Sequence, residues 1–391
     1  MDRRTFLTST AILGATAALS GCGGGGDSTD RTVSATSLKG KQAVLDKLLQ
    51  DFMTKTGVPG ATVSLLNTNE EIVSVAGVRV LGRPEKILEA DSFHLGSNTK
   101  SMLAMLILHS AELGELKLET PIYSLLPNLK STGKAAYANV TLEQLLSHQA
   151  GIEPLLVVQD IEETLPVFDG TVTEQRRQAL VFLTARDPIA APGASFVYSN
   201  GGYAVAAAVL EAVTGQTYER LLDERLLTPL GSRGTVGWPG LTNPAAPYGH
   251  YFDAGVFTPF EPNDPRAVFR PALTPAGNIS MPIRNYANYL RAHLSALRGE
   301  ASKVLSRASY QRMHRAIPGT QFGYALGWAT DGKDKLGAQV DNHYGSTDIF
   351  GCYALVQPAK NRAVAVIVNG EKPPFDEPIS SLAYAILALT D

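Results

Sequence analysis

Apolar segments typical of β-strands stand at both ends of this 391-residue chain, and this arrangement constrains its fold more than any other feature. Near the start, helical spacing at residues 40–54 precedes GATVSLLN and EEIVSVAGVRV, a pattern that predicts two paired strands. The chain closes with four more expected strands and a helix near 377–389; the strands are FGYALGWAT, AQVDNHYG, FGCYALVQP and RAVAVIVN. We therefore expect an α/β fold, with an antiparallel sheet built from both termini, flanked by helices and holding a large, mostly helical insertion.

The expected domain organisation follows from this arrangement. Residues 39–391 are expected to form a single domain, in which 39–92 and 322–391 supply the α/β part. Residues 93–321, rich in helical patterns and in Pro and Gly breaks, supply the mainly helical part. A functional site is expected in the cleft between the two parts.

The first 38 residues have the composition of an export signal and a tether. The opening MDRRTFLTSTAILGATAALSGC has a charged start and an apolar run at residues 5–20 that is too short for a membrane span. Its Arg-Arg-x-Phe-Leu stretch resembles the twin-arginine export signal, and LSGC resembles the bacterial lipoprotein processing site. We therefore expect a signal peptide at 1–21, lipid on Cys22 and a tether at 22–38, giving an exported, periplasmic lipoprotein anchored to a membrane. The alternative is a soluble secreted protein cut nearby, with Cys22 incidental.

Composition limits the remaining function classes. The formal net charge is −3, so nothing indicates the basic face that nucleic-acid binding requires. If Cys22 carries lipid, Cys352 has no intrachain partner, and the fold depends on its core rather than on disulfides. The histidines show no metal-ligand spacing, so we expect no metal, and no cofactor is implied.

A hydroxyl and an amine stand one helical turn apart in HLGSNTKSMLAMLILHSAELG, residues 94–114. Ser97 and Lys100 share a helix face, and no ionised side chain occurs from Ser101 to Ala111. Burial in such a helix lowers the pKa of a lysine, because an apolar environment disfavours the charged form. A partly neutral amine can take the proton of a serine hydroxyl, and free N–H groups at the helix start suit a developing oxyanion. The alternative is a polar pair that merely begins a helix.

S-x-x-K and Y-x-N each occur more than once, so the copy that belongs to the site has to be chosen from its context. A second S-x-x-K, Ser131–Lys134, lacks a following apolar helix, so we interpret it as a solvated loop. A tyrosine ionised by nearby cations can handle the second proton of an acylation, and Y-x-N occurs three times. Tyr137–Asn139 lies in the same polar loop, and Tyr286–Asn288 lies in an amphipathic helix where the tyrosines are expected to pack. Tyr198–Asn200 follows Pro and Gly and precedes an apolar helix, so it shares the context of Ser97 and is the candidate.

Three motifs together resemble those of the penicillin-recognising serine hydrolases: Ser97-x-x-Lys100, Tyr198-Ser199-Asn200 and His343-Tyr344-Gly345. The most similar branch contains class C β-lactamases, D-Ala-D-Ala carboxypeptidases, D-aminopeptidases and related esterases. Surrounding segments are similar to that branch in the same order over about residues 40–390: LLSHQAGI, PGASFVYSNGGY, LTPAGNIS, FGYALGW and HYGSTDIFGCYALVQP. The resemblance implies a β-lactamase/transpeptidase-like catalytic domain.

The resemblance also implies the residues of the reaction. Ser97 is the nucleophile that becomes acylated, and Lys100 and Tyr198 share the general base and acid work. Asn200 contacts the amide side of the substrate. The backbone N–H groups of Ser97 and Ser346 form the oxyanion hole.

The third motif supplies further substrate contacts and departs from the β-lactamase pattern. His343 and Gly345 are expected beside the substrate, the alternative for His343 being a surface strand histidine, and His148 is expected to be structural. β-Lactamases usually carry Lys-Thr-Gly here, so a permanent charge is replaced by a group with a pKa of about 6.5 and a small hydroxyl by the ring of Tyr344. Both changes weaken recognition of a substrate carboxylate, for which Ser346 could supply a hydroxyl instead.

Three functions stay open on this basis. The first is an exported serine hydrolase that cleaves amide or ester bonds of small-molecule or short-peptide substrates, including cell-wall peptide, as a D-Ala-D-Ala-carboxypeptidase-like enzyme or a D-amino-acid peptidase. The second is a carboxylesterase with weak β-lactamase activity. The third is a penicillin-binding-like protein without turnover. The chain has no G-x-S-x-G, which excludes an α/β-hydrolase elbow.

Overall fold

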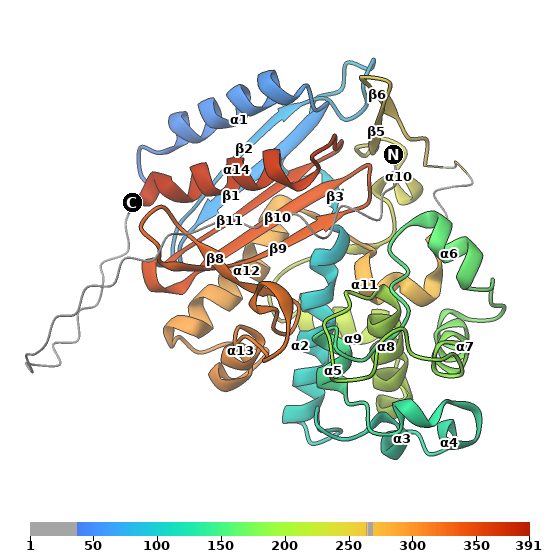
Figure 1. Ribbon diagram of the computed structural model, residues 1–391. Coiled ribbons are helices and arrows are strands. Elements are labelled where there is room, and N and C mark those ends of the chain that lie inside the picture. The colour runs from blue at the N-terminus through green and yellow to red at the C-terminus, as the bar shows by residue number, and fades with distance from the viewer. Residues whose placement is uncertain (1–36, 263, 265–268) are drawn as a thin grey trace, which may run out of the picture. The chain divides into compact units, whose positions relative to one another are not determined.

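The central sheet takes its strands from both ends of the chain. In the computed structural model, which describes residues 37–391 apart from 263 and 265–268, its order is β2-β1-β11-β10-β9-β8 and neighbouring strands are antiparallel. The strands are β1 (Gly60–Leu66), β2 (Glu71–Gly77), β8 (Ala329–Lys333), β9 (Gln339–Ser346), β10 (Gly351–Gln357) and β11 (Arg362–Val368). The α/β class and the antiparallel sheet built from both termini are confirmed (Figure 1). The expected signal peptide and Cys22 lie outside the described residues.

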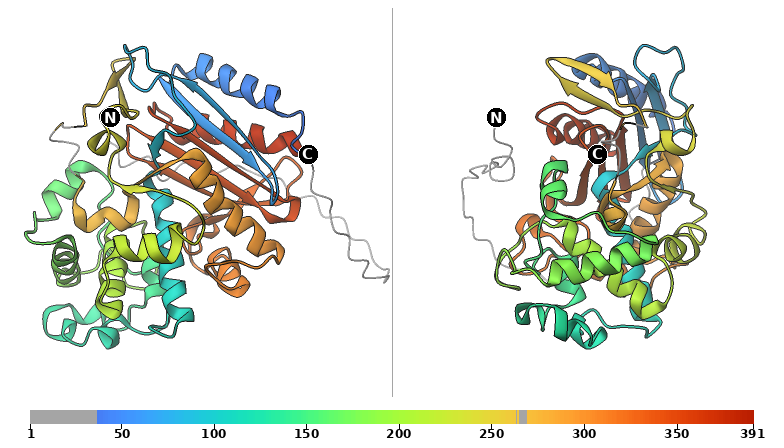
Figure 2. Two further views of the ribbon diagram at one scale, coloured as in Figure 1. Left: turned by 180° about the vertical axis from the view of Figure 1, so that it is seen from behind. Right: turned by 90° about the vertical axis from the view of Figure 1, so that its right-hand side faces the viewer.

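Helices cover both faces of this sheet. α1 (Gln42–Thr56) and α14 (Asp376–Leu387) pack side by side on one face, and α12 (Ile283–Arg298) packs on the other (Figures 1 and 2). Strand β11 (RAVAVIV) is apolar on both faces. Val364, Val366 and Val368 pack into the core beneath α1 and α14, and Ala363, Ala365 and Ile367 pack into the core on the α12 side. A strand buried on both faces loses the apolar–polar alternation of a one-sided sheet. α12 thus belongs to the sheet layer, although its residues fall in the segment expected to be the helical part.

The rest of the chain is mainly helical, as expected. α2 (Thr99–Glu112) is buried on nearly every side, as the run without ionised residues from Ser101 to Ala111 predicts, and it follows the 3-10 turn η2 (Gly96–Asn98). No helix within the described ranges is long and apolar enough to cross a membrane. The other helices are α3 (Ile122–Leu125), α4 (Leu129–Thr132), η3 (Ala135–Tyr137), α5 (Leu142–Leu146), α6 (Val158–Thr164), α7 (Val172–Thr184), α8 (Asn200–Thr214), α9 (Tyr218–Leu221), η4 (Leu222–Leu227), α10 (Pro239–Thr242), η6 (Pro271–Leu273), α11 (Thr274–Gly277), α13 (Arg307–Met313), η7 (Gln321–Gly323), η8 (Pro358–Lys360) and η9 (Ala388–Thr390).

Two features of the chain differ from the expectation. The segment FGYALGWAT was expected to be a strand, but β8 begins only at Ala329. Phe322 has left-handed backbone (φ 56°) and an exposed side chain, and the amide of Ala325 bonds to the carbonyl of Trp328 within the segment. Tyr324, Leu326 and Trp328 are therefore buried in a loop and not in a strand. The middle of the chain also contains short strands: β3 (Ser92–His94), β7 (Ile279–Pro282) and β4 (Thr235–Val236) form one sheet, and β5 (His250–Asp253) and β6 (Val256–Pro259) form a hairpin.

Candidate active site

Ser97 and Lys100 meet at the start of α2. Ser97 lies in η2 and is half-buried, whereas Lys100 in the first turn of α2 is completely buried. The Nζ atom of Lys100 is 3.0 Å from Ser97 Oγ. It is also 2.7 Å from Asn200 Oδ1 and 2.7 Å from the carbonyl oxygen of Ala276.

The surroundings of Lys100 favour its neutral form. Burial lowers the pKa of this amine well below its usual value. A neutral amine has two N–H bonds and one lone pair, and the oxygens of Asn200 and Ala276 can only accept hydrogen bonds. Both hydrogens are therefore committed to these oxygens, and the lone pair is directed at the hydroxyl of Ser97. This arrangement suits a general base.

Tyr198 lies against the same pair. Its ring centroid is 4.8 Å from Lys100 Nζ, and its phenol is close enough to Ser97 for the serine to lower the phenol's pKa. Burial raises the pKa of the Tyr198 phenol, and Ser97 only partly offsets this effect. The expectation of an ionised tyrosine is therefore wrong: the phenol is neutral at neutral pH, because it is desolvated and its neighbour Lys100 carries little charge. It suits a proton donor rather than a second base.

The loop before α8 holds Tyr198 and Asn200 in place. Ser199 caps α8, since its hydroxyl accepts a hydrogen bond from the Gly202 amide at 2.8 Å and donates one to the Glu153 carbonyl at 2.6 Å. Asn200 donates from Nδ2 to the Leu155 carbonyl at 2.8 Å, which turns its Oδ1 toward Lys100. Asn200 is half-buried, so its side chain remains reachable.

His148 has the structural role expected for it, and it supports the loop that carries Tyr198. Its Nδ1 accepts the amide N–H of Ser199 at 3.0 Å, and its ring lies 4.1 Å from that of Tyr198, centroid to centroid. Burial lowers the pKa of His148, so the ring is neutral and its Nδ1 lone pair is available for this bond. His148 thus holds the loop that carries Tyr198 and Ser199 in place.

His343 reaches the same region from β9. It is buried, which excludes the alternative of a surface histidine, and its Nε2 is 3.0 Å from Tyr324 Oη. Burial, with a smaller contribution from Lys100, lowers its pKa to about 3. His343 is therefore neutral at pH 7 and offers no positive charge to a substrate carboxylate.

Close contact between η2 and β9 brings two backbone amides together. A Cβ atom at Gly345 would lie 2.8 Å from the Ser97 nitrogen, and one at Gly96 would lie 2.7 Å from the Ser346 nitrogen, so both positions require glycine. The Thr347 amide bonds to the Phe350 carbonyl, and hydrogen-bonded pairs alternate along an antiparallel ladder. The Ser346 amide consequently points away from β10 and, like that of Ser97, is suited to an oxyanion.

The side chain of Ser346 does not face the site, so the expectation that its hydroxyl could contact a substrate carboxylate is wrong. Side chains alternate along β9, and Ser346 lies on the face opposite to Gly345, with Tyr344. Both hydroxyls donate to the carboxylate of Glu371, each at 2.5 Å.

The competing copies of the motifs are placed elsewhere. Ser131 and Lys134 are exposed, and Lys134 forms a surface ion pair with Asp187. Tyr286 packs in α12, as expected, and its hydroxyl donates to Asn98 Oδ1 at 2.8 Å. Tyr137 is buried, so placing it in a solvated loop was wrong; its ring belongs to the core of the helical part.

Sequence reasoning missed three contributors to the site. These are the Ala276 carbonyl that binds Lys100, the Tyr324 hydroxyl beside His343, and Asn98, whose Nδ2 donates to the Cys352 carbonyl and ties η2 to the sheet. The segments that carry the first two, LTPAGNIS and FGYALGW, were singled out, but no short motif indicates which of their atoms meet the serine. The described residues contain no cluster of His, Cys, Asp or Glu able to hold a metal ion.

A serine beside a buried lysine and a tyrosine, at the junction of an antiparallel sheet and a helical part, defines the class of serine–lysine acyl-transfer sites. A family model described as Beta-lactamase matches residues 45–389, and the chain belongs to this family.

Individual relatives are distant. The chain is 26% identical over 327 residues to penicillin-binding protein 4 of Amycolatopsis lactamdurans, covering 81% of this chain and 82% of the relative. It is 22% identical to protein flp of Staphylococcus aureus (strain N315), covering 84% of this chain and spanning 63% of the length of that relative. Among solved structures, a β-lactamase/D-alanine carboxypeptidase from Pseudomonas syringae superimposes with a TM-score of 0.71 at 18% identity, covering 89% of this chain and 99% of that one.

Proposed function

We propose that this protein is a serine hydrolase that cleaves amide or ester bonds through an acyl-enzyme on Ser97. One observation carries this proposal: Lys100 Nζ lies 3.0 Å from Ser97 Oγ while two carbonyl oxygens occupy its other hydrogen-bonding directions. A buried lysine without a carboxylate partner is costly, and it is unusual in a part of the molecule that serves stability alone.

The geometry supports the following sequence of steps. Ser97 Oγ attacks the carbonyl carbon of the substrate while Lys100 takes the hydroxyl proton, and the amides of Ser97 and Ser346 stabilise the oxyanion. The bond to the leaving nitrogen or oxygen then breaks, and a proton reaches that atom from Tyr198 or from the protonated Lys100. Water attacks the acyl carbon in the second half of the reaction and releases the acid, which restores Ser97.

For the substrate, we propose short peptides with D-amino acids, cleaved by a D-Ala-D-Ala-carboxypeptidase-like or D-amino-acid peptidase activity. The fold shared with the Pseudomonas syringae β-lactamase/D-alanine carboxypeptidase supports this choice. A carboxylesterase is the second candidate, because the neutral His343 favours substrates without a carboxylate at that position.

Labelling should identify the nucleophile directly. We expect one equivalent of a tagged fluorophosphonate to add to the protein, and peptide mapping by mass spectrometry to place it on Ser97. Ser131 serves as an internal control, since it heads the second S-x-x-K motif but is exposed and lacks a buried amine. An adduct at Ser131, or none at all, contradicts the proposed function.

A substrate panel then separates the candidates. D-Ala-D-Ala peptides, D-amino-acid amides, p-nitrophenyl esters and nitrocefin are compared with the same preparation. Preferential release of amines from D-residues supports the peptidase, and cleavage of the esters alone supports the carboxylesterase. Weak turnover of nitrocefin is expected in both cases, and efficient turnover contradicts the argument from His343.

We further propose that the protein is exported and anchored to a membrane by lipid on Cys22. The motif around this cysteine supports the proposal. Replacing Cys22 by Ser in the full-length protein should move it from the membrane fraction to the soluble fraction, because the thiol that accepts the lipid is gone. Cys352→Ser is the matched control, and equal partitioning of both variants contradicts the anchor.

A further inference from the structure

A buried carboxyl group lies against β9, the strand that carries the Ser346 amide, on the face opposite to Ser97. Glu371 follows β11 and is 2% exposed, and it accepts hydrogen bonds from Tyr344 Oη and Ser346 Oγ at 2.5 Å each. Among the described residues it has no ion pair. A carboxylate buried without a cation is destabilising, so its persistence at this position calls for a reason other than stability.

The two hydroxyls that bind Glu371 flank the residue that touches Ser97. Tyr344 and Ser346 lie on either side of Gly345 along β9, and their side chains point to the face that carries α1 and α14. Gly345 points the other way, against the backbone of Ser97. Glu371 therefore binds β9 at Tyr344 and Ser346, on the face opposite to Ser97. These bonds help to fix where the Ser346 amide lies.

We propose that Glu371 is a positioning residue, which holds the Ser346 amide in place for the oxyanion while it is protonated and which slows acylation of Ser97 when it ionises. This inference rests on the proposed acylation of Ser97. Glu371 does not touch the substrate and acts only through β9.

The charges around Glu371 favour its neutral form. Besides Tyr344, which bonds to it, the titratable groups whose charges influence Glu371 are Asp348 after β9, Asp376 of α14 and Cys352 of β10, whose side chain lies on the other face of the sheet. The adjacent Lys372 directs its amine over the ring of Phe252, at 5.8 Å from the centroid. Burial raises the pKa of Glu371 to about 8, the two hydroxyls lower it by less, and Asp348 and Asp376 raise it further.

Protonation of Glu371 changes both its hydrogen bonds to β9 and the charge near the oxyanion. A neutral acid accepts from one of the two hydroxyls through its carbonyl oxygen and donates its own proton to the oxygen of the other, so it satisfies both without bringing a charge, whereas the ionised form accepts from both. The ionised form places an uncompensated negative charge behind the amide that receives the oxyanion, and weak screening inside the protein makes the two negative charges repel. Acylation should therefore slow as pH rises through the pKa of Glu371.

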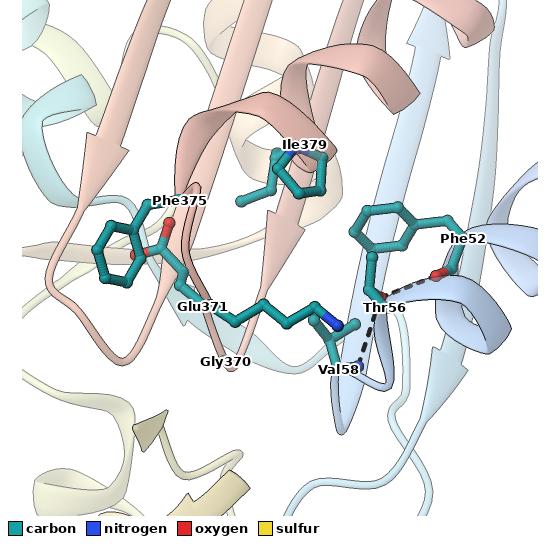
Figure 3. A pocket seen from close by; sticks show the side chains of 9 residues that line it. Phe52, Thr56, Val58, Gly370, Glu371, Phe375 and Ile379 are labelled. Atoms are coloured by element: carbon teal, nitrogen blue, oxygen red, sulfur yellow. Dashed lines mark hydrogen bonds between the residues drawn. The ribbon is translucent and has the colours of Figure 1, made fainter. Parts of the chain in front are cut away.

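A small recess lies beside Glu371 on the face of the sheet that carries α1 and α14. Its volume of about 10 Å³ has room for about one water molecule, and it is lined by Glu371 and Lys372, by Phe52 and Thr56 of α1, and by Phe375 and Ile379 at the start of α14 (Figure 3).

The test measures the rate of fluorophosphonate addition to Ser97 against pH in wild type, Glu371→Gln and Glu377→Gln. Glutamine keeps the shape of the protonated acid and cannot ionise, and Glu377 is an exposed glutamate of α14 that serves as the control. Each rate at about pH 9.5 is divided by the rate of the same variant at about pH 6.5, which removes differences in basal rate. We expect this ratio to be about tenfold higher in Glu371→Gln than in wild type, since only wild type acquires the buried charge, and unchanged in Glu377→Gln.

A second variant keeps the test independent of how well Glu371→Gln folds. Ser346→Ala keeps the backbone amide but removes a hydroxyl that lowers the pKa of Glu371, so the decline in rate should move to higher pH. Thermal melts at each pH show that the variants are folded. If Ser97 is labelled but wild type and both Glu371→Gln and Ser346→Ala share one pH profile, the positioning role is wrong and the proposed function stands. If wild type is not labelled at any pH, the positioning role of Glu371 and the proposed function are both wrong.

Discussion

Replacing Ser97 by Ala is expected to abolish covalent labelling and to lower hydrolysis of the best substrate by about 10³-fold or more, to the level left by binding and the oxyanion amides. The substitution removes the only atom that can form the acyl bond, while the backbone amide of residue 97 stays in place. Because Ser97 is half-buried and its hydroxyl lies beside the side chains of Lys100 and Tyr198, the fold should tolerate a methyl group there. The measurement is steady-state hydrolysis of the substrate that the panel identifies.

Ser131→Ala is the matched control for this prediction. It changes the serine of the second S-x-x-K motif, whose lysine is engaged in a surface ion pair. Its rate should equal that of wild type within twofold or so, because exposed substitutions of this kind rarely matter. Turnover that survives in Ser97→Ala would remove Ser97 as the nucleophile.

Replacing Lys100 by Met is expected to lower acylation of Ser97 by about 10²- to 10⁴-fold, the range that a positioned general base contributes. Methionine fills the volume of the buried lysine stem but has no lone pair basic enough to take a proton. The pH profile should change as well. In wild type the rate rises as pH passes upward through the folded-state pKa of Lys100, which burial holds well below its usual value, because only the neutral amine is a base.

The loss of this rising limb distinguishes the chemical role of Lys100 from a packing role. A variant that is merely less stable keeps the limb at the same pH, whereas Lys100→Met should lack it. Lys134→Met is the control, since this lysine occupies the same place in the exposed motif. Equal rates and equal pH profiles for wild type and Lys100→Met would show that another group is the base.

Local patterns were informative where the physics is local. Apolar segments predicted β1, β2, β9, β10 and β11, and the run without ionised residues predicted that α2 is buried. The same reasoning failed for FGYALGWAT, because apolar composition predicts burial and not backbone conformation, and the left-handed Phe322 interrupts any strand there. It also missed β3, β4 and β7, which are two to four residues long and pair across distant parts of the chain.

The residues of the site could be named from the motifs, but their states of charge could not. Ser97 and Lys100 share one helical turn, so their proximity follows from helix geometry. The neutral states of His343 and Tyr198 depend on how deeply other segments bury them, and the expectations of a histidine with an ordinary pKa and an ionised tyrosine were both wrong.

The sequence by itself determines the fold class, the strands of the sheet and the closeness of Ser97 to Lys100. Each of these depends on residues within a few positions of one another. The tertiary structure alone decides which atoms surround that lysine, which way Ser346 faces and that Glu371 stands behind it. Those relations join segments more than 20 residues apart, and burial, which sets the charge of each group, is a property of the assembled fold.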